Sequence, residues 1–440
     1  MQFLPQILFL AALGVTVYFI TKRVLLIKRA IQLGKADDRT DQPGLRLKNM
    51  VLLAFGQKRM FNKPMVGILH LAVYVGFVLI NIEMLEIVLD GLLGTHRIFF
   101  KPLGVLYPAL INFFEILALG VIIACVVFLI RRNILKVDRL QPSKHKEMSK
   151  WPALDGNLIL IFEIVLMSAF LKMNAADSIL QSRGLEHYSE ALTGSFIISQ
   201  YYQVFMVNFS DSFLIFIERT CWWFHILGVM SFALYVTYSK HLHIVLAFPN
   251  TYFGDLQPKG EMTNMPAVAT EVKIMMGLED APEVAGEIGR FGAKDVEDLS
   301  WKSLMDAFTC TECGRCTDAC PANITGKLLS PRAIMMKTRD RLEDIQQGWK
   351  EHGKDYKDDK SLLDDYITSE EILACTSCNA CVQECPVMIN PLTIITDLKR
   401  YRVMEESKAP ASWNGMFQNI ETNMAPWKFS PDERLNWAKE

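Results

Sequence analysis

Eight of the chain's ten cysteines fall in two runs with identical spacing. Residues 310–321 read Cys-Thr-Glu-Cys-Gly-Arg-Cys-Thr-Asp-Ala-Cys-Pro, and residues 375–386 read Cys-Thr-Ser-Cys-Asn-Ala-Cys-Val-Gln-Glu-Cys-Pro. Three closely spaced thiolates can bind three corners of an iron–sulfur cube, while the fourth, followed by proline, points toward a second cube. The spacing therefore predicts two [4Fe–4S] clusters and one-electron redox chemistry.

In this pattern the fourth cysteine of each run ligates the cluster of the other run. The first cluster is expected on Cys310, Cys313, Cys316 and Cys385, and the second on Cys375, Cys378, Cys381 and Cys320. A pair of structural zinc sites is an alternative, although zinc prefers two CxxC pairs with a longer gap between them. Disulfides are a further alternative, but the topology deduced below places these cysteines in a reducing compartment.

Five long apolar segments lie at roughly 3–21, 64–94, 103–130, 154–171 and 212–239. Each approaches or exceeds the roughly 20 residues that a helix needs to cross a bilayer. The loop residues 22–63 hold eleven Lys and Arg and residues 131–150 hold seven, whereas 95–102 hold two and 173–211 hold one. The positive-inside rule then puts the N-terminus outside and everything after the fifth segment in the cytoplasm. Cys125 and Cys221 are interpreted as buried apolar residues within these segments.

Composition divides the chain near residue 249. Residues 1–248 carry a net charge of +8 and residues 249–440 a net charge of −10. The 54 residues between the two cysteine runs show little strand pattern, and helix starts are predicted at Ser330-Pro331 and at Ser369. We therefore expect an all-α protein, with a five-helix transmembrane bundle followed by a cytoplasmic α-helical ferredoxin domain.

The expected domains follow from these observations. They are the transmembrane bundle over 1–248, a linker over 249–298, a two-cluster ferredoxin domain over 299–406 and a C-terminal docking tail over 407–440. The tail is expected to dock onto this domain or a partner because it is rich in aromatic residues, namely Trp413, Phe417, Trp427, Phe429 and Trp437. No nucleic-acid partner is expected.

Histidines within the apolar segments are the next candidates for chemistry, since polar side chains inside a bilayer are expensive. His225 and His243 are eighteen residues, or five helical turns, apart, so both are expected on one helix face about 27 Å apart along the axis, while His241 is rotated by about 160° and should face elsewhere. His70 lies near the cytoplasmic entrance of the second segment. Two histidines from different helices could hold a b-type haem. The alternative is a polar helix end at Lys240, His241 and His243, with His70 hydrogen-bonded to a neighbouring helix.

Four carboxylates also fall within the apolar segments, in the outer half that the topology assigns to His225. Reduction of a quinone takes up two protons, so a quinone site needs protonatable groups. The candidates for such a site are His225, Glu218, Glu115 and Glu83. The alternative is that some of these carboxylates are paired or reach the headgroups, which we favour for Glu86.

The membrane part resembles the cytochrome b (gamma) subunit of respiratory nitrate reductases. Residues 224–228, Phe-His-Ile-Leu-Gly, through residues 238–244, Tyr-Ser-Lys-His-Leu-His-Ile, are similar to its fifth helix, and Gly-Ile-Leu-His ending at His70 is similar to its second. The resemblance implies that His70 and His243 bind the haem b nearest the cytoplasm. The partner for an outer haem falls at Ile80, which cannot bind iron. One haem is therefore expected, and a second only if His225 finds another partner; otherwise His225 serves a quinone.

The whole chain resembles membrane-bound iron–sulfur oxidoreductases, similar to the heterodisulfide reductase C subunit fused to that cytochrome. The similar stretches are Asp-Leu-Ser-Trp at 298–301, Lys-Leu-Leu-Ser-Pro-Arg at 327–332, Asn-Ile-Glu at 419–421 and Ala-Pro-Trp at 425–427. The resemblance implies a separate partner polypeptide with a cysteine-rich domain like the heterodisulfide reductase B subunit. It also implies an electron-transfer flavoprotein or another flavoenzyme as a donor.

These observations predict a subunit of a quinone-linked iron–sulfur oxidoreductase in the cytoplasmic (inner) membrane. It would pass electrons between a cytoplasmic redox partner, two [4Fe–4S] clusters, haem b and the quinone pool, with the catalytic half on a separate chain. One alternative is a quinol-oxidising subunit that delivers electrons to the heterodisulfide reductase B-like subunit. An alternative from another class is a redox-sensing scaffold or a proton-conducting membrane protein.

Overall fold

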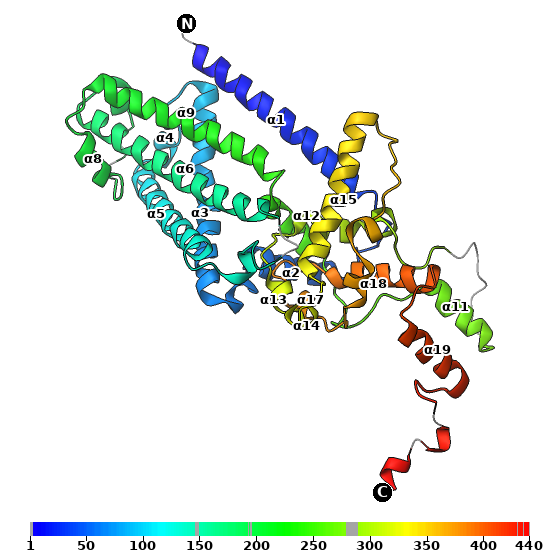
Figure 1. Ribbon diagram of the computed structural model, residues 1–440. Helices are drawn as coiled ribbons and strands as arrows, with labels where there is room; N and C mark the ends of the chain where they lie inside the picture. The colour runs from blue at the N-terminus through cyan, green and yellow to red at the C-terminus, as the bar shows by residue number, and fades with distance from the viewer. Residues whose placement is uncertain are drawn as a thin grey trace.

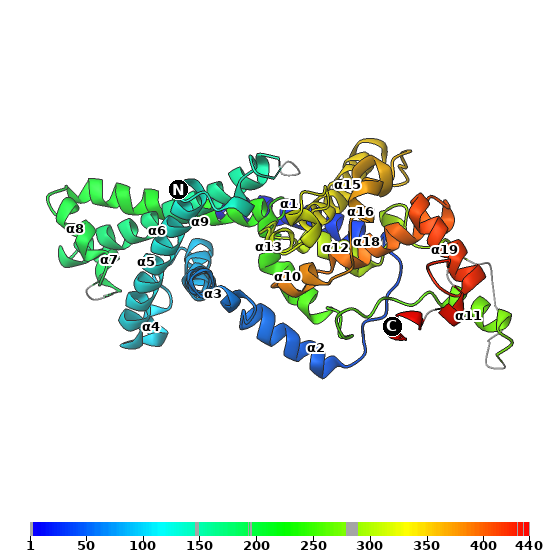
Figure 2. The same cartoon turned by 60° about the horizontal axis from the view of Figure 1, so that its bottom comes forward.

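The computed structural model describes residues 3–145, 149–191, 193, 196–278, 289–428, 430–433 and 435–439. This part of the chain is built from helices and contains no strand beyond two isolated bridges. Figures 1 and 2 show an elongated bundle on one side and a second group of shorter helices beside one of its ends. The predicted all-α class is confirmed.

Five helices are long and apolar enough to cross a membrane among the described residues. They are α1 (Leu4–Ile31), α3 (Pro64–Leu93), α5 (Leu106–Asn133), α6 (Trp151–Ser182) and α9 (Asp211–Val236). Helices α3, α5, α6 and α9 pack side by side, whereas α1 contacts α3 and α9 and runs on toward α15 (Figure 1). The five spans expected from hydropathy are therefore present as helices.

The ends of these long helices follow local signals in the sequence. Pro64 occupies the first turn of α3, where its missing N–H costs nothing. Gly94 ends α3 in the left-handed conformation, at a φ of +73° that side chains other than glycine rarely adopt. Ser210 caps α9 because its hydroxyl accepts a hydrogen bond from the backbone N–H of Phe213.

The remaining elements are short. The helices are α2 (Pro43–Met50), α4 (Phe100–Leu103), α7 (Glu186–Ser189), α8 (Gln200–Met206), α10 (His243–Tyr252), α11 (Pro266–Met275), α12 (Trp301–Thr309), α13 (Arg315–Asp318), α14 (Pro321–Ile324), α15 (Pro331–His352), α16 (Ser369–Leu373), α17 (Ala380–Glu384), α18 (Pro391–Arg400) and α19 (Ala411–Asn423). Single turns of helix lie at Val51–Phe55, Met60–Asn62, Asp138–Leu140, Lys240–Leu242, Val296–Asp298, Tyr401–Glu405, Pro431–Glu433 and Asn436–Ala438.

One prediction about the fifth span is wrong, because the helix does not continue from His225 to His243. Helix α9 ends at Val236, a 3₁₀ turn covers Lys240–Leu242, and α10 begins at His243. Ser239 causes the break: its backbone is extended, and its hydroxyl donates to the carboxylate of Asp155 on α6 at 2.9 Å. A helical phase that was calculated across residues 225–243 therefore does not apply.

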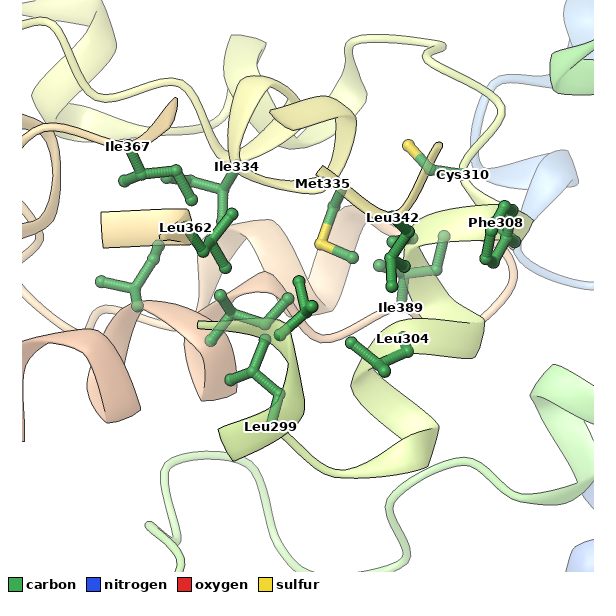
Figure 3. Close-up of a cluster of buried hydrophobic side chains, with 14 of the residues drawn as sticks. Leu299, Leu304, Phe308, Cys310, Ile334, Met335, Leu342, Leu362, Ile367 and Ile389 are labelled. Atoms are coloured by element: carbon green, nitrogen blue, oxygen red, sulfur yellow. The ribbon is translucent and has the colours of Figure 1, made fainter. Parts of the chain in front are cut away.

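Residues 290–406, here called the helical body, enclose their own hydrophobic core. Leu299, Leu304, Phe308, Ile334 and Met335 converge there with Leu342, Leu362, Ile367 and Ile389, as Figure 3 shows. Helix α15 begins after Ser330, whose hydroxyl caps it, and α16 begins at Ser369, so both predicted helix starts are confirmed. The cap of α16 is Thr368, which forms a capping box with Glu371.

The helical body and the bundle are joined by the segment that follows the first span. Arg23 on α1 donates to the side-chain oxygen of Gln346 at 2.5 Å, and Ile27 and Ala30 lie in the core of the body. Lys35 exchanges backbone hydrogen bonds with Leu299 and Trp301, at 2.7 and 3.1 Å. Figure 2 shows α2 and its preceding loop extending between the bundle and the body.

Parts of the predicted linker are buried in the helical body, whereas the predicted tail is exposed. Helix α10 runs across the expected boundary at residue 249, and Ala293 and Val296 are buried in the core of the helical body. Helix α19 in the tail buries none of its residues, and Trp427 and Trp437 are 69 % and 77 % exposed. Phe429 lies outside the described residues.

Candidate functional site

The two cysteine loops have the same backbone conformation. Glu312 and Gly314 in the first run have a positive φ, and so do Ser377 and Asn379 at the corresponding positions of the second run. These left-handed residues turn each loop sharply back on itself, so that consecutive cysteines face the same side. Each loop leads into a short helix, and the two helices, α13 and α17, pack against each other.

The structure brings the eight thiols together in two sets of four. Four of them line one pocket between α14, α17 and α18, namely Cys320, Cys375, Cys378 and Cys381. The thiol of Cys316 interacts electrostatically with those of Cys310, Cys313 and Cys385, and less strongly with that of Cys381. The fourth cysteine of each run therefore lies with the first three of the other run, and the assignment of each set to one cluster stays a prediction.

The environment of these thiols suits metal ligands. Burial raises the pKa of the Cys310, Cys381 and Cys385 thiols to about 12, so they lose their protons when iron binds rather than in the free protein. Backbone N–H groups of Ser377 and Ile389 donate to the sulfurs of Cys375 and Cys385 at 3.4 and 3.3 Å. Within the described residues, no three His, Cys, Asp or Glu side chains converge as ligands of a single metal ion.

A cavity of about 350 Å³ lies where the bundle meets the helical body. Its membrane side contains His70 from α3 and His243 from the start of α10, and its other side contains Cys313 of the first thiol set. The Nδ1 of His70 donates to the side-chain oxygen of Gln57 at 2.9 Å, and the Nδ1 of His243 donates to the carbonyl of Lys240 at 3.0 Å. Both imidazoles therefore keep Nε2 available for a ligand.

His241 lies in the same cavity, which contradicts the prediction that it faces elsewhere. Because α9 stops at Val236, the turn at Lys240–Leu242 redirects the chain, and the rings of His241 and His243 come within 5.7 Å of each other. The Nδ1 of His241 lies 3.1 Å from the hydroxyl of Ser239. Burial, together with the nearby His243, holds the pKa of His241 well below its usual value.

Basic side chains line the wall of this cavity that lies nearest the helical body. They are Arg131, Arg132, Arg139, Lys240 and Arg315. The Nε of Arg139 and one Nη of Arg315 are buried without a hydrogen-bond partner in the described part of the chain. Glu312 also lines the cavity, but it is paired with Arg339. Buried donors without partners are costly, so this wall is suited to an anionic ligand group.

A second, smaller cavity of about 50 Å³ lies deeper in the bundle, next to His225. His225 is only 1 % exposed, and its Nδ1 donates to the carbonyl of Leu166 at 3.1 Å. Ile80 lines the same cavity, so an aliphatic side chain faces His225 from α3. Glu163 on α6 lines both cavities. Sequence analysis missed it, although it is the carboxylate nearest the middle of the fourth apolar segment.

The predicted quinone-site carboxylates do not line either cavity. Glu115 is fully buried and accepts hydrogen bonds from the backbone N–H groups of Ile198 and Ser199, at 2.8 and 3.2 Å. Glu83 lies 3.8 Å from Arg97, and Glu218 lies 3.0 Å from Arg219. Glu86 accepts from the backbone N–H of Phe99, in line with the paired alternative. The structure therefore places these groups at the opposite end of the bundle from the helical body.

Comparison with known proteins identifies the helical body. Residues 309–389 match the family model of the 4Fe–4S dicluster domain. The chain therefore carries a 4Fe–4S dicluster domain. That range contains both cysteine loops and the helices α13, α14, α15, α16 and α17 that separate or follow them. No solved structure matches the chain.

Three curated proteins are similar to the chain. It is 29 % identical to a probable iron–sulfur-binding oxidoreductase, FadF, of Bacillus subtilis, over 97 % of this chain and 60 % of that protein. It is 26 % identical to an EtfAB:quinone oxidoreductase of Syntrophomonas wolfei, over 91 % and 55 % respectively. It is 29 % identical to a probable membrane-anchored ferredoxin of Chromohalobacter salexigens, over 34 % and 24 %.

The chain thus spans about 55–60 % of the length of the first two relatives. The names of these relatives and the dicluster domain support an iron–sulfur oxidoreductase function in electron transfer. The five apolar helices and the membrane-anchored relative support a location in a membrane. The expectation of an iron–sulfur protein with a membrane part is confirmed at this level.

Proposed function

We propose that this protein transfers electrons between a soluble redox partner and the membrane quinone pool. One observation carries the proposal: Cys313 of the first thiol set and the membrane histidines His70 and His243 line one and the same cavity. A redox group on the thiols and a redox group on the histidines would then be close neighbours. The function of the relative named EtfAB:quinone oxidoreductase agrees with this arrangement.

The residues present fit the two kinds of redox group that the proposal needs. Each set of four thiols can hold a [4Fe–4S] cluster, with Cys320 and Cys385 as the exchanged ligands. His70 and His243 can hold a haem b through Nε2, because Gln57 and the carbonyl of Lys240 fix Nδ1. Bound there, the clusters and the haem would supply one-electron carriers in series between the partner and the membrane.

The basic wall of the cavity supports a haem in particular. Haem b carries two propionate groups, and the unpartnered donors of Arg139 and Arg315 face the same space as the histidines. Charge-assisted hydrogen bonds from arginine to carboxylate are among the strongest that proteins make. We propose one haem, because Ile80 lines the cavity of His225 and its aliphatic side chain cannot bind iron.

The quinone reacts near His225 in this proposal. Since the carbonyl of Leu166 accepts the Nδ1–H of His225, Nε2 is left to exchange a proton with a quinone oxygen. We propose that the helical body faces the cytoplasm, which agrees with the basic loops 22–63 and 131–150. An electron-transfer flavoprotein is the proposed soluble partner. A heterodisulfide reductase B-like domain on a partner chain is proposed as well, and in that case quinol oxidation supplies its electrons.

The decisive experiment is anaerobic reduction of the purified membrane protein by a quinol analogue. We expect a low-spin b-haem spectrum, eight cluster irons per chain and reduction of both kinds of group. The variant His225→Ala should slow this reduction and leave the haem spectrum intact. Protein that binds neither haem nor quinol-reducible clusters would instead be a scaffold, and the proposal would be abandoned.

The exchange of the fourth ligands has its own test. Cys320→Ser should damage the cluster held by the second run, halve the cluster iron and leave the signal of the set with Cys385, since only one fourth ligand is lost. Electron paramagnetic resonance of the reduced protein measures both signals. Selective loss of the first-run cluster would contradict the assignment.

A further inference from the structure

Glu163 stands at the junction of the two cavities. It lines both the cavity of His70 and His243 and the cavity of His225. The two cavities share three further wall residues, which are Val73 and Phe77 from α3 and Phe232 from α9. Glu163 is therefore the acidic side chain of a shared wall that is otherwise apolar.

Glu163 has no hydrogen bond or ion pair to any other residue that the structure describes. This distinguishes it from Glu86 and Glu115, which each accept backbone N–H groups. A carboxylate inside a membrane-spanning helix is expensive, so one without a structural partner is a candidate for function. Its position on two cavities indicates that its carboxyl group interacts with what occupies them.

The other titratable groups that line the two cavities come from several elements. On the bundle they are His70 and Tyr74 on α3, Cys125, Arg131 and Arg132 on α5, and His225 on α9. The turn that follows α9 contributes Lys240 and His241, the start of α10 contributes His243, and Arg139, Glu312, Cys313 and Arg315 line the side nearest the helical body. Glu312 also lines the large cavity but is paired with Arg339, so Glu163 is the carboxylate of this cavity that is left to accept a proton when an electron arrives.

We propose that Glu163 takes up one proton when the site of His70 and His243 takes up one electron. This inference rests on the proposed function, because quinol or the reduced soluble partner supplies the electron. The added negative charge is balanced by a proton that forms an O–H bond on the carboxylate, and reoxidation returns both. The field of one charge on another is strong in an apolar cavity, so the two events are coupled.

The small cavity supplies a route for that proton. Its volume of about 50 Å³ has room for a few water molecules, since one water needs roughly 10–15 Å³ measured in this way. Glu163, His225 and Asn81 all line it and offer the hydrogen bonds that such waters require. Protons released or taken up at His225 can therefore reach Glu163 without entering the large cavity.

The test is a redox titration of the haem in the full-length protein at a series of pH values. With one proton per electron, each pH unit changes the reduction equilibrium tenfold, which is about 59 mV for a one-electron couple. Wild type should show this slope, and Glu163→Gln should abolish it while the haem spectrum stays the same. The matched control is Glu86→Gln, a buried bundle carboxylate outside both cavities, which should keep the slope.

Redox-induced infrared difference spectra give a second readout, in which a carboxylic acid band should appear on reduction and be missing in Glu163→Gln. If Glu163→Gln fails to assemble, Glu163→Asp provides the test. The pH range over which the haem potential depends on pH should shift in this variant, and an unchanged range overturns the inference. A pH-independent potential in wild type, or a slope retained in Glu163→Gln, also overturns it. Absence of haem from wild type overturns the proposed function as well, so the two failures are distinguishable.

Discussion

Buried polar side chains at the two ends of the helical bundle differ in their hydrogen bonds. At the end away from the helical body, Glu86, Asp90 and Glu115 accept backbone N–H groups and so fasten the loops to the helices. At the end beside the helical body, His70 and His243 are fixed at one nitrogen only and face a cavity. The three carboxylates at the far end therefore hold loops in place, whereas the two histidines keep one nitrogen free to bind a ligand.

The largest effect is expected from the cavity end. His243→Ala should remove the haem completely, because no other side chain on α10 replaces the ligand, whereas His241→Ala should retain it. The absorbance spectrum of the dithionite-reduced protein measures this. If His241→Ala loses the haem and His243→Ala keeps it, the axial ligand is the other histidine of the turn, and our assignment is wrong.

At the opposite end the expected effect is on stability. Glu115→Ala should lower the free energy of unfolding by about 3 kcal/mol, since it leaves the N–H groups of Ile198 and Ser199 buried without an acceptor. Thermal unfolding in detergent measures this. The haem and cluster content of the surviving folded protein should be normal. Loss of cofactor at unchanged stability would break the contrast between the two ends.

Gln57 provides a finer test of the cavity end. Gln57→Leu removes the acceptor that fixes the Nδ1 of His70, and groups that orient a metal ligand in this way typically contribute about 10–100-fold to affinity. We expect haem affinity to fall within that range while stability changes little. Reconstitution of haem-free protein with haem measures the affinity. An unchanged affinity would show that the hydrogen bond does not orient the ligand.

The smallest effect is expected for Asp90→Asn. The single side-chain oxygen of asparagine can accept from the N–H of Arg97 or from that of Ile98 but not from both, so the charge and one of the two hydrogen bonds are lost. We expect about 1 kcal/mol of lost stability and no change in quinol-driven reduction. A defect in that reduction would show that the far end also takes part in the reaction.

Local patterns in the sequence predicted much of this structure. The five spans, the starts of α15 and α16 and the two cysteine loops depend on nearby residues, so hydropathy, capping and spacing were sufficient to predict them. The break between α9 and His243 was not predicted, since Ser239 at this break bonds to Asp155, which lies 84 residues away in the sequence. The eighteen-residue interval from His225 to His243 therefore indicated a shared face that does not exist.

The carboxylates named as quinone-site candidates lie outside both cavities, and their role stays a prediction. Depth in the membrane grouped Glu83, Glu115 and Glu218 with His225, but depth alone does not say whether a side chain faces a loop or a cavity. Glu163 faces a cavity, and only the packing of α6 against α3 and α9 shows it. Hydrogen-bond partners contributed by distant loops are the information that the sequence did not provide.

The contact of Arg23 with Gln346 has a consequence for biosynthesis, since the two residues are 323 positions apart. The ribosome makes α1 long before α15, so the basic end of α1 has no partner in the helical body until that later part of the chain has been made and has folded. The same contacts bury Ile27 and Ala30 only once the helical body has formed its core. A chain whose helical body has not folded therefore exposes part of its first helix. This exposed surface distinguishes incompletely folded molecules from folded ones before they join an electron-transfer chain.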